Sequence, residues 1–273
     1  MKWLFGLLAA GLLAISAQAA TVFTLGVLPN HSARTLAASY EPLRAYLALH
    51  LKQPVRIESA ADFTRFQERT RRGDFDLTLT AGHLARLLQK DAGFQPLAQF
   101  TPDHTALLMG SIDQPISSIS QLGGRQVAVV DRLAATVMAT LSHLAAQGLQ
   151  AGRDFRVVEH RSHASAAYSL NSGLSAALVT THQGMQYMPL ELRNRLVELQ
   201  RVTEVPALVF LARPELPKAR AAALTKRLLD FQREPAGTAF LQQLGYRSLV
   251  EADEARMKRV DGYLKATRSA LTP

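Results

Sequence analysis

Short apolar runs alternate with segments of helical periodicity in the part of the chain that follows residue 20. The pattern predicts strands at 22–28, 55–58 and 75–80, with helices at 33–51, 63–72 and 84–90. Asp62 is the expected N-cap of the second helix, and Gly73 is its expected C-cap. This β-α-β-α-β-α order predicts a parallel sheet with helices on both faces.

The same alternation restarts after about residue 110 and predicts a second α/β unit. The expected elements are strands around 95–100 and 106–109, a short helix at 116–122, a strand at 126–130, a helix at 135–147, a strand at 155–159, a helix at 163–170, a strand at 176–179, a strand at 205–212, and helices at 219–233, 236–243 and 251–269. Two such units in one chain indicate two lobes with a cleft between them.

The first residues have the features of a secretory signal peptide, which we assign to residues 1–19. A positive start at Lys2 precedes an apolar run over 3–15, and an Ala-x-Ala cleavage site follows in 16–20. The apolar run is short for a bilayer span, and an uncleaved anchor is the alternative reading. No Cys follows the run, so a bacterial lipoprotein anchor is excluded. We therefore expect a mature protein that is exported to the periplasm.

Charge and cysteine content narrow the classes of partner. The chain has 31 basic and 22 acidic residues, a net charge of +9, and no Cys. Thiol chemistry and Cys-ligated metals are thereby excluded. A basic protein suits nucleic acid, anionic lipid or an anionic small molecule, and export argues against nucleic acid. Arg69, Arg71 and Arg72 form a tight cluster at a predicted helix end, where cations are favourable for structural reasons.

Several motifs, in their order along the chain, resemble those of one family. The matching segments are 40–47 (YEPLRAYL), 72–77 (RGDFDL), 116–128 (ISSISQLGGRQVA), Ser162-His163, Val205-Pro206 and 234–237 (EPAG). In this order they are similar to the periplasmic phosphate/phosphite/phosphonate-binding proteins of ABC transporters, over nearly the whole mature chain.

The resemblance implies an α/β fold of two doubly wound lobes joined by a two-strand hinge, the periplasmic binding protein-like II fold, with the ligand cleft between the lobes. It implies that residues 20–110 and 205–273 form lobe one and that 111–204 form lobe two. Ligands of open α/β sheets bind at the carboxyl ends of strands, where helix N-termini present free N–H groups to an anion. The expected ligand is a small oxyanion.

Candidate ligand-binding residues follow the predicted strands. Thr80 and His83 lie after the third strand, and the resemblance gives Thr80 the position of a residue that contacts the ligand. His83 can equally be an exposed residue at a helix start.

The loop after 126–130 supplies further candidates: Asp131, Arg132, Ala135 and Thr136. The family's Ser-Thr-Ser is replaced here by Ala134-Ala135-Thr136, which keeps one hydroxyl, although backbone N–H groups remain available. Arg132 is a possible replacement donor, or else a surface Arg.

The start of the next helix and the strand after it supply the last two candidates. His163 matches the family's histidine at a helix start, where it either faces the ligand or packs structurally. Thr180 closes the following strand, where Thr181 offers a second hydroxyl. Ser175 stands where the family has an amine-binding acid, so an aminoalkylphosphonate is disfavoured.

Two functions fit these expectations. One is an ABC-transporter component that delivers the oxyanion to a permease; the other is a sensory protein that presents it to a membrane sensor kinase. An enzyme is not expected, because no nucleophile elbow, metal-ligand spacing or Gly-rich phosphate loop is present. His83, His163 and Asp131 could form a metal site or an acid–base set only if the fold brought them together. We expect no cofactor, no metal and a monomer.

Overall fold

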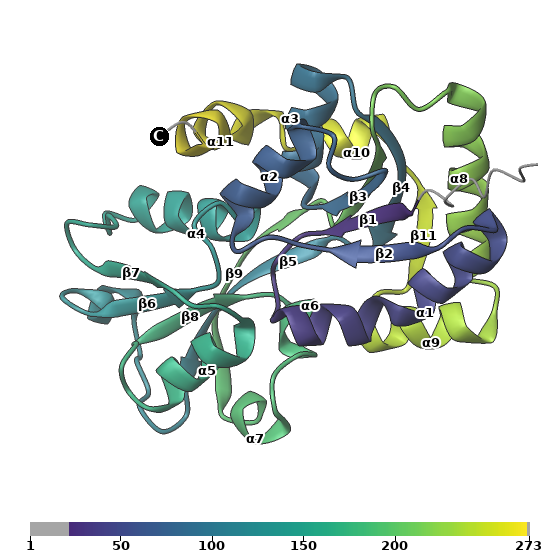
Figure 1. Ribbon diagram of the computed structural model, residues 1–273. Helices are drawn as coiled ribbons and strands as arrows, with labels where there is room; N and C mark the ends of the chain where they lie inside the picture. Colours follow the sequence, from purple (N-terminus) through teal and green to yellow (C-terminus); the bar gives the residue numbers. More distant parts are fainter. Residues whose placement is uncertain (1–21, 272–273) are drawn as a thin grey trace, which may run out of the picture.

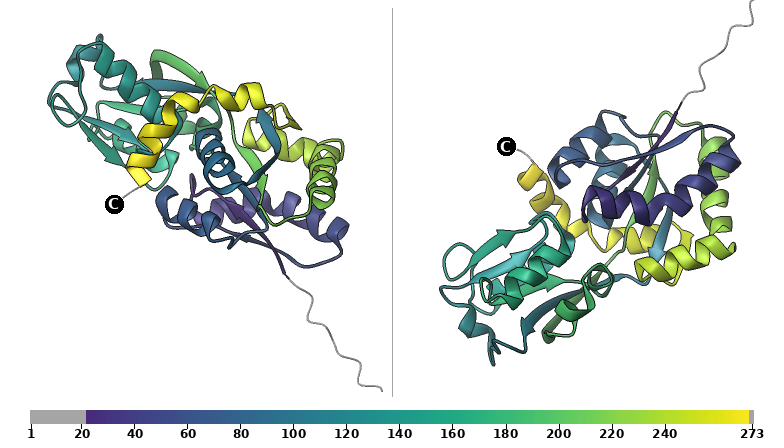
Figure 2. Two further views of the ribbon diagram at one scale, coloured as in Figure 1. Left: turned by 90° about the horizontal axis from the view of Figure 1, so that it is seen from above. Right: turned by 60° about the horizontal axis from the view of Figure 1, so that its bottom comes forward.

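The computed structural model describes residues 22–271 and shows two α/β lobes side by side (Figure 1; Figure 2). The predicted signal peptide, 1–19, lies outside the described residues. Each lobe has one sheet with helices on both of its faces, as the alternating pattern predicts.

Lobe one is built on a six-stranded sheet in the order β11-β4-β10-β3-β1-β2. Its strands are β1 (Phe23–Val27), β2 (Val55–Glu58), β3 (Leu77–Thr80), β4 (Gln95–Thr101), β10 (Val209–Ala212) and β11 (Ser248–Glu251). β1 pairs in parallel with β2 and β3, whereas β10 is antiparallel to both β3 and β4. Its helices are α1 (Ala33–Leu51), α2 (Phe63–Arg71), α3 (Gly82–Ala92), α8 (Lys218–Phe231), α9 (Pro235–Leu244), α10 (Glu254–Lys258) and α11 (Leu264–Leu271).

Lobe two is built on a five-stranded sheet in the order β7-β6-β8-β5-β9. Its strands are β5 (His104–Ser111), β6 (Gln126–Val129), β7 (Arg156–Glu159), β8 (Ala177–Thr180) and β9 (Leu196–Val205). Its helices are α4 (Ala135–Ala146), α5 (His163–Asn171), α6 (His182–Met185) and α7 (Leu190–Arg193). β6 is parallel to β7 and β8, and α4 and α5 cover opposite faces of these strands (Figure 1).

The chain passes between the sheets twice, from β4 to β5 and from β9 to β10. The first crossing lies at residues 101–104, so β5 pairs within the second sheet and the expected boundary at 111 falls at its end. Arg259 holds the two crossings together: it donates to Asp103 at 2.7 Å and to the carbonyl oxygen of Glu204 at 3.3 Å.

Several elements differ from the sequence prediction. β9 and β11 were not expected, because neither has a run of buried side chains that marks a strand. The short helices α6 and α7 were not expected either. The helix expected over 251–269 is instead α10, a 3₁₀ turn at Asp261–Tyr263, and α11.

The cluster of Arg residues at the end of α2 is structural, as expected. Arg69 pairs with Asp74 at 2.9 Å and also with Glu58, and Arg72 reaches Asp74 at 3.2 Å. At the start of the same helix, Asp62 accepts from the N–H of Arg65 at 2.7 Å, which confirms it as the N-cap. Arg69 and Arg72 are therefore held by ion pairs at this helix end.

The lobes are in direct contact. Leu133, in the loop before α4, is buried among the core residues of lobe one. On the other side of α4, the fully buried Thr267 of α11 lies 3.9 Å from the sulfur of Met138. The structure is therefore a closed form, with α11 laid against lobe two (Figure 2).

Candidate functional site

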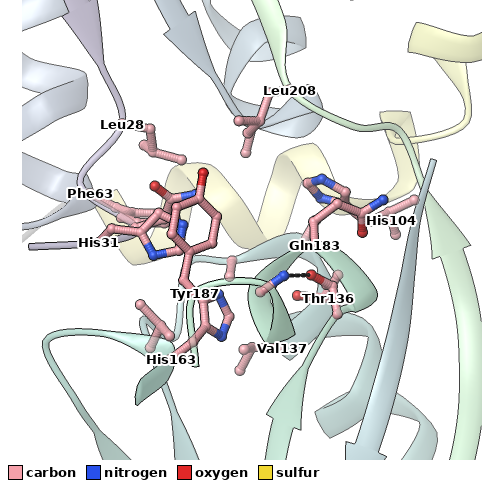
Figure 3. Close-up of a pocket in the computed structure, with 18 of the residues that line it drawn as sticks. Leu28, His31, Phe63, His104, Thr136, Val137, His163, Gln183, Tyr187 and Leu208 are labelled. Carbon is pink, nitrogen blue, oxygen red and sulfur yellow. Dashed lines mark hydrogen bonds between the residues drawn. The ribbon is translucent and has the colours of Figure 1, made fainter. Parts of the chain in front are cut away.

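A cavity of about 70 Å³ lies between the lobes, at the carboxyl ends of β1, β6 and β8 (Figure 3). Leu28 follows β1, Val130 follows β6 and Thr181 follows β8, and all three line the cavity. Drug-sized ligands occupy pockets of roughly 300–1,000 Å³, so this cavity suits a much smaller molecule.

The start of α4 forms one wall of the cavity. Ala134 is the N-cap of α4 and supplies no side-chain hydrogen bond, and the first turn of the helix from Ala135 to Val137 lines the cavity. The first backbone bond of the helix runs from Met138 N–H to the Ala134 carbonyl. Within the described chain, the N–H groups of residues 135–137 have no backbone or side-chain acceptor. The positive end of α4 therefore opens onto the cavity.

The start of α5 also contributes to the cavity wall, in a different way. Ser162 caps this helix, accepting from Ser165 N–H at 3.1 Å, and a reciprocal bond completes a capping box. The next residue, His163, lines the cavity, with its Nδ1 3.0 Å from the hydroxyl of Thr180. Gly184 packs so closely on the ring that a Cβ there would lie 2.7 Å from the His163 Cε1. At this helix start the cavity is lined by the fixed ring of His163, whereas the N–H of Ser165 is already bonded to the Ser162 side chain.

Three histidines line the cavity, and burial holds each of them neutral at pH 7. Burial lowers the pKa of His163 and of His104 to about 4. Burial lowers the pKa of His31 well below its usual value, and the nearby His163 lowers it further. The rings of His31 and His163 have centroids 5.6 Å apart, and His31 stacks on Tyr187 at 3.5 Å (Figure 3).

The cavity as a whole is uncharged. None of the side chains that line it in residues 22–271 is Asp, Glu, Lys or Arg. Its tyrosines keep their protons, since burial raises the pKa of Tyr187 to about 12 and that of Tyr246 well above its usual value. The hydroxyl of Tyr246 lies 2.6 Å from the Nε2 of His104. The site can offer N–H and O–H donors but no formal cation.

Two residues bind one lobe to the other beside the cavity. His83 of α3 donates its Nε2–H to the carbonyl oxygen of Leu133 at 2.6 Å, and burial lowers its pKa to about 4. Asp131 accepts from the N–H of Phe63 at the start of α2 at 3.3 Å and from Leu133 N–H at 2.8 Å. Burial raises the pKa of Asp131 to about 6. The His83–Leu133 and Phe63–Asp131 bonds cross between the lobes and depend on their closed arrangement.

The sequence matches a family model over residues 25–257, and that model describes the periplasmic substrate-binding proteins of ABC phosphonate transporters. The chain belongs to this family. Its relatives are transport components that bind a substrate and are not enzymes. The match favours transport over the sensory alternative. A comparison with curated proteins gives no match.

Solved structures share the fold of this substrate-binding protein at low sequence identity. A binding component of an ABC phosphonate transporter from Pseudomonas aeruginosa has a TM-score of 0.80 at 15% identity, over 93% of this chain and 89% of its own. PhnD1 from Prochlorococcus marinus, solved with methylphosphonate, has a TM-score of 0.77 at 14% identity, over 90% and 98%. A Xanthomonas citri protein solved with ATP has a TM-score of 0.71 at 19% identity, over 91% and 98%. The fold is that of the type II periplasmic binding proteins.

The sequence nominated eight candidate ligand-binding residues. Three of them, Ala135, Thr136 and His163, line the cavity of this substrate-binding protein. Thr180 lies behind His163 and bonds to it. Arg132 points away, donating its guanidinium to the carbonyl oxygen of Val157 at 2.7 Å, which agrees with the surface alternative.

The other three nominated residues also lie outside the lining. His83 and Asp131 join the lobes, and the fully buried hydroxyl of Thr80 has no partner within the described residues. His83, Asp131 and His163 therefore do not converge. No group of three His, Cys, Asp or Glu that could hold a metal occurs in residues 22–271.

Sequence reasoning missed several residues of the site: Asn30, His31, His104, Gln183 and Tyr187. A usable signal existed for two of them, because Asn30 and His31 follow β1 just as His83 follows β3. Gln183 lies in the short helix α6 and Tyr187 follows it, and neither position is marked by the end of a strand. Ser175, in contrast, is buried against Ser169 at 2.9 Å and does not line the cavity.

No helix within residues 22–271 is long and apolar enough to span a membrane.

Proposed function

We propose that this protein captures a small phosphonate-like oxyanion in the interlobe cavity and delivers it to the permease of an ABC transporter. One observation carries the proposal: the uncapped first turn of α4 opens into the interlobe cavity that His163 also lines. Free helix N–H groups and the positive end of the helix dipole bind anions without a formal cation.

The proposed roles of the site residues follow from their contacts. The N–H groups of Ala135 and Thr136, with the Thr136 hydroxyl, donate to the oxyanion. Thr180 donates to Nδ1 of His163, which leaves the ring proton on Nε2 for the ligand. Thr180 is thus a positioning residue.

Closure of the lobes is the second part of the proposal. The bonds of His83 and Asp131 form only when the lobes meet, so they hold the closed form around the ligand. Arg259 fixes the two crossings about which the lobes bend.

The cellular setting follows from the family and from the predicted signal peptide. We propose that residues 1–19 are removed on export and that the mature chain works in the periplasm as a monomer. Methylphosphonate, which PhnD1 was solved with, is a suitable first ligand to test.

The test is a thermal-shift and calorimetric screen of the mature protein, residues 20–273, against phosphate, phosphite, methylphosphonate and sulfate. We expect at least one of these anions to stabilise the protein and His163→Ala to abolish that stabilisation. Arg132→Ala is the matched control, because Arg132 bonds outside the cavity, and it should retain binding. Stabilisation by neutral or cationic solutes alone would refute the proposal.

A further inference from the structure

Hydrogen-bond donors and an apolar patch line different parts of the cavity. Lobe two contributes the N–H groups at the start of α4, the Thr136 hydroxyl and His163, with Val137 beside them. Lobe one contributes a patch of apolar core side chains, Leu28, Phe63 and Leu208, with the polar His31 at its edge. In Figure 3 Leu28 and Leu208 lie across the cavity from Thr136 and His163. A ligand that satisfies both walls carries oxygens on one side and an apolar group on the other.

A second observation, independent of the helix start, marks the cavity as a polar binding site. His31 is only 7% exposed, lines the cavity, and has no hydrogen-bond partner among the described residues. Gln183 also lines it, and its buried side-chain oxygen has no partner there. Buried polar groups are normally paired, so these side chains indicate a bound molecule that completes their bonds.

The uncharged lining sets a limit on the charge of that molecule. The cost of removing an ion from water grows as the square of its charge, so a dianion costs roughly four times as much as a monoanion of the same size. Among the described residues, no Lys or Arg lines the cavity to offset that cost. The three histidines are neutral at pH 7 because burial lowers their pKa values. Helix dipoles supply only about half of a unit charge each.

The lining also lacks a partner for an ammonium group. No carboxylate lines the cavity within the described chain, since Asp131 lies outside it and bonds to Phe63 and Leu133. An amine on the ligand would lose its hydration without gaining a counter-charge.

We infer that the cavity selects a singly charged tetrahedral oxyanion with one apolar substituent, the oxygens bound by lobe two and the substituent packed on lobe one. The inference rests on the proposed function and specifies its ligand class. A phosphonate monoanion, a phosphonate monoester and a short alkanesulfonate belong to this class, whereas sulfate, phosphate dianion and aminoalkylphosphonates do not.

Calorimetry on the mature protein separates charge from shape. Methylphosphonate changes from monoanion to dianion between pH 6 and pH 9 at nearly constant shape, whereas methanesulfonate stays singly charged. We expect the affinity for methylphosphonate to fall by at least about tenfold over this range, while that for methanesulfonate changes by less than about threefold. Constant or rising methylphosphonate affinity, or sulfate binding as tightly as methanesulfonate, would overturn the inference and leave the proposed function standing. If no anion binds, the proposed function fails as well.

The apolar wall has its own test at fixed pH. Methylphosphonate should bind at least about tenfold more tightly than phosphate, whose extra hydroxyl would face Leu208 without a partner. Leu208→Asn should remove this preference, and Leu208→Met, which keeps an apolar side chain of similar volume, should retain it. Equal affinities for phosphate and methylphosphonate in the unmodified protein would contradict the apolar wall, whatever the variants show.

Discussion

The helices α4 and α5 both begin at the cavity, yet a side chain caps the N-terminus of α5 and none caps that of α4. Ser162 caps α5 through a reciprocal pair of bonds, and the helix offers the ring of His163. Ala134 is the N-cap of α4 but makes no side-chain hydrogen bond, so the N–H groups of the first turn stay free. A capped start builds a rigid mount for a side chain, and an uncapped start leaves its own N–H groups for a ligand.

The comparison bears directly on the loss of the family's Ser-Thr-Ser motif. Only Thr136 of the three positions keeps a hydroxyl. The backbone donors do not depend on side-chain identity, so Ala134 and Ala135 leave the free N–H groups at the start of α4 intact. The absence of two hydroxyls instead reduces the number of donors, in agreement with a ligand of low charge.

The largest expected effect comes from closing the open helix start. Ala134→Asp would place a carboxylate at the N-cap, where it accepts the free N–H groups and repels an anion. We expect the affinity for methanesulfonate to fall by at least about 100-fold in calorimetry. Ala134→Asn is the control without charge; it caps the helix and should cost about tenfold. If Ala134→Asp binds as well as the unmodified protein, the open start of α4 is not the anion site.

A smaller effect is expected on the pH dependence of stability, to which residues near the two helix starts contribute with opposite sign. Burial lowers the pKa of His163 from 6.5 to about 4, so its contribution to stability is complete above pH 6.5 and is lost as the pH falls toward 4. Burial raises the pKa of Asp131, in the loop before α4, from 3.8 to about 6, so its contribution is complete below 3.8 and is lost as the pH rises to 6.

His163→Gln removes the first of these two contributions. Between pH 7.5 and pH 5, the free energy of unfolding of the ligand-free variant should fall by about 2 kcal/mol less than that of the unmodified protein. Denaturant titrations at both pH values measure this difference. Parallel pH profiles for the two proteins would show that His163 is not held neutral by the fold.

The smallest effect tests the capped start. Ser162→Ala removes the side-chain acceptor for Ser165 N–H and should lower the free energy of unfolding by about 1 kcal/mol. Ligand affinity should change by less than about threefold, because the freed N–H group bonds to water. A loss of affinity comparable to that of Ala134→Asp would mean that both helix starts bind the ligand directly.

The sequence predicts the scaffold well because its signals are local. Apolar runs mark β1, β3, β6 and β8, and helical periodicity marks α1, α2, α4 and α5. β9 escapes prediction because its side chains are mostly exposed, so neither a run nor an alternation of apolar residues marks it.

The site was predictable only where it follows a strand end or a recognised motif. Ala135, Thr136 and His163 satisfy that condition. His31 and Tyr187 meet only when lobe two closes on lobe one, and no local pattern encodes that meeting. Lobe closure also explains why His83 and Asp131 follow strands yet bond to the other lobe instead of lining the cavity.

The most direct test of the account is a titration of the ¹⁵N-labelled mature protein with methanesulfonate, followed by amide resonances. The account predicts saturable downfield shifts of the amide protons of Ala135 and Thr136, with little change at Arg132, whose N–H already bonds to Glu159 at 2.7 Å. Saturable binding that leaves the amides at the start of α4 unshifted would contradict it.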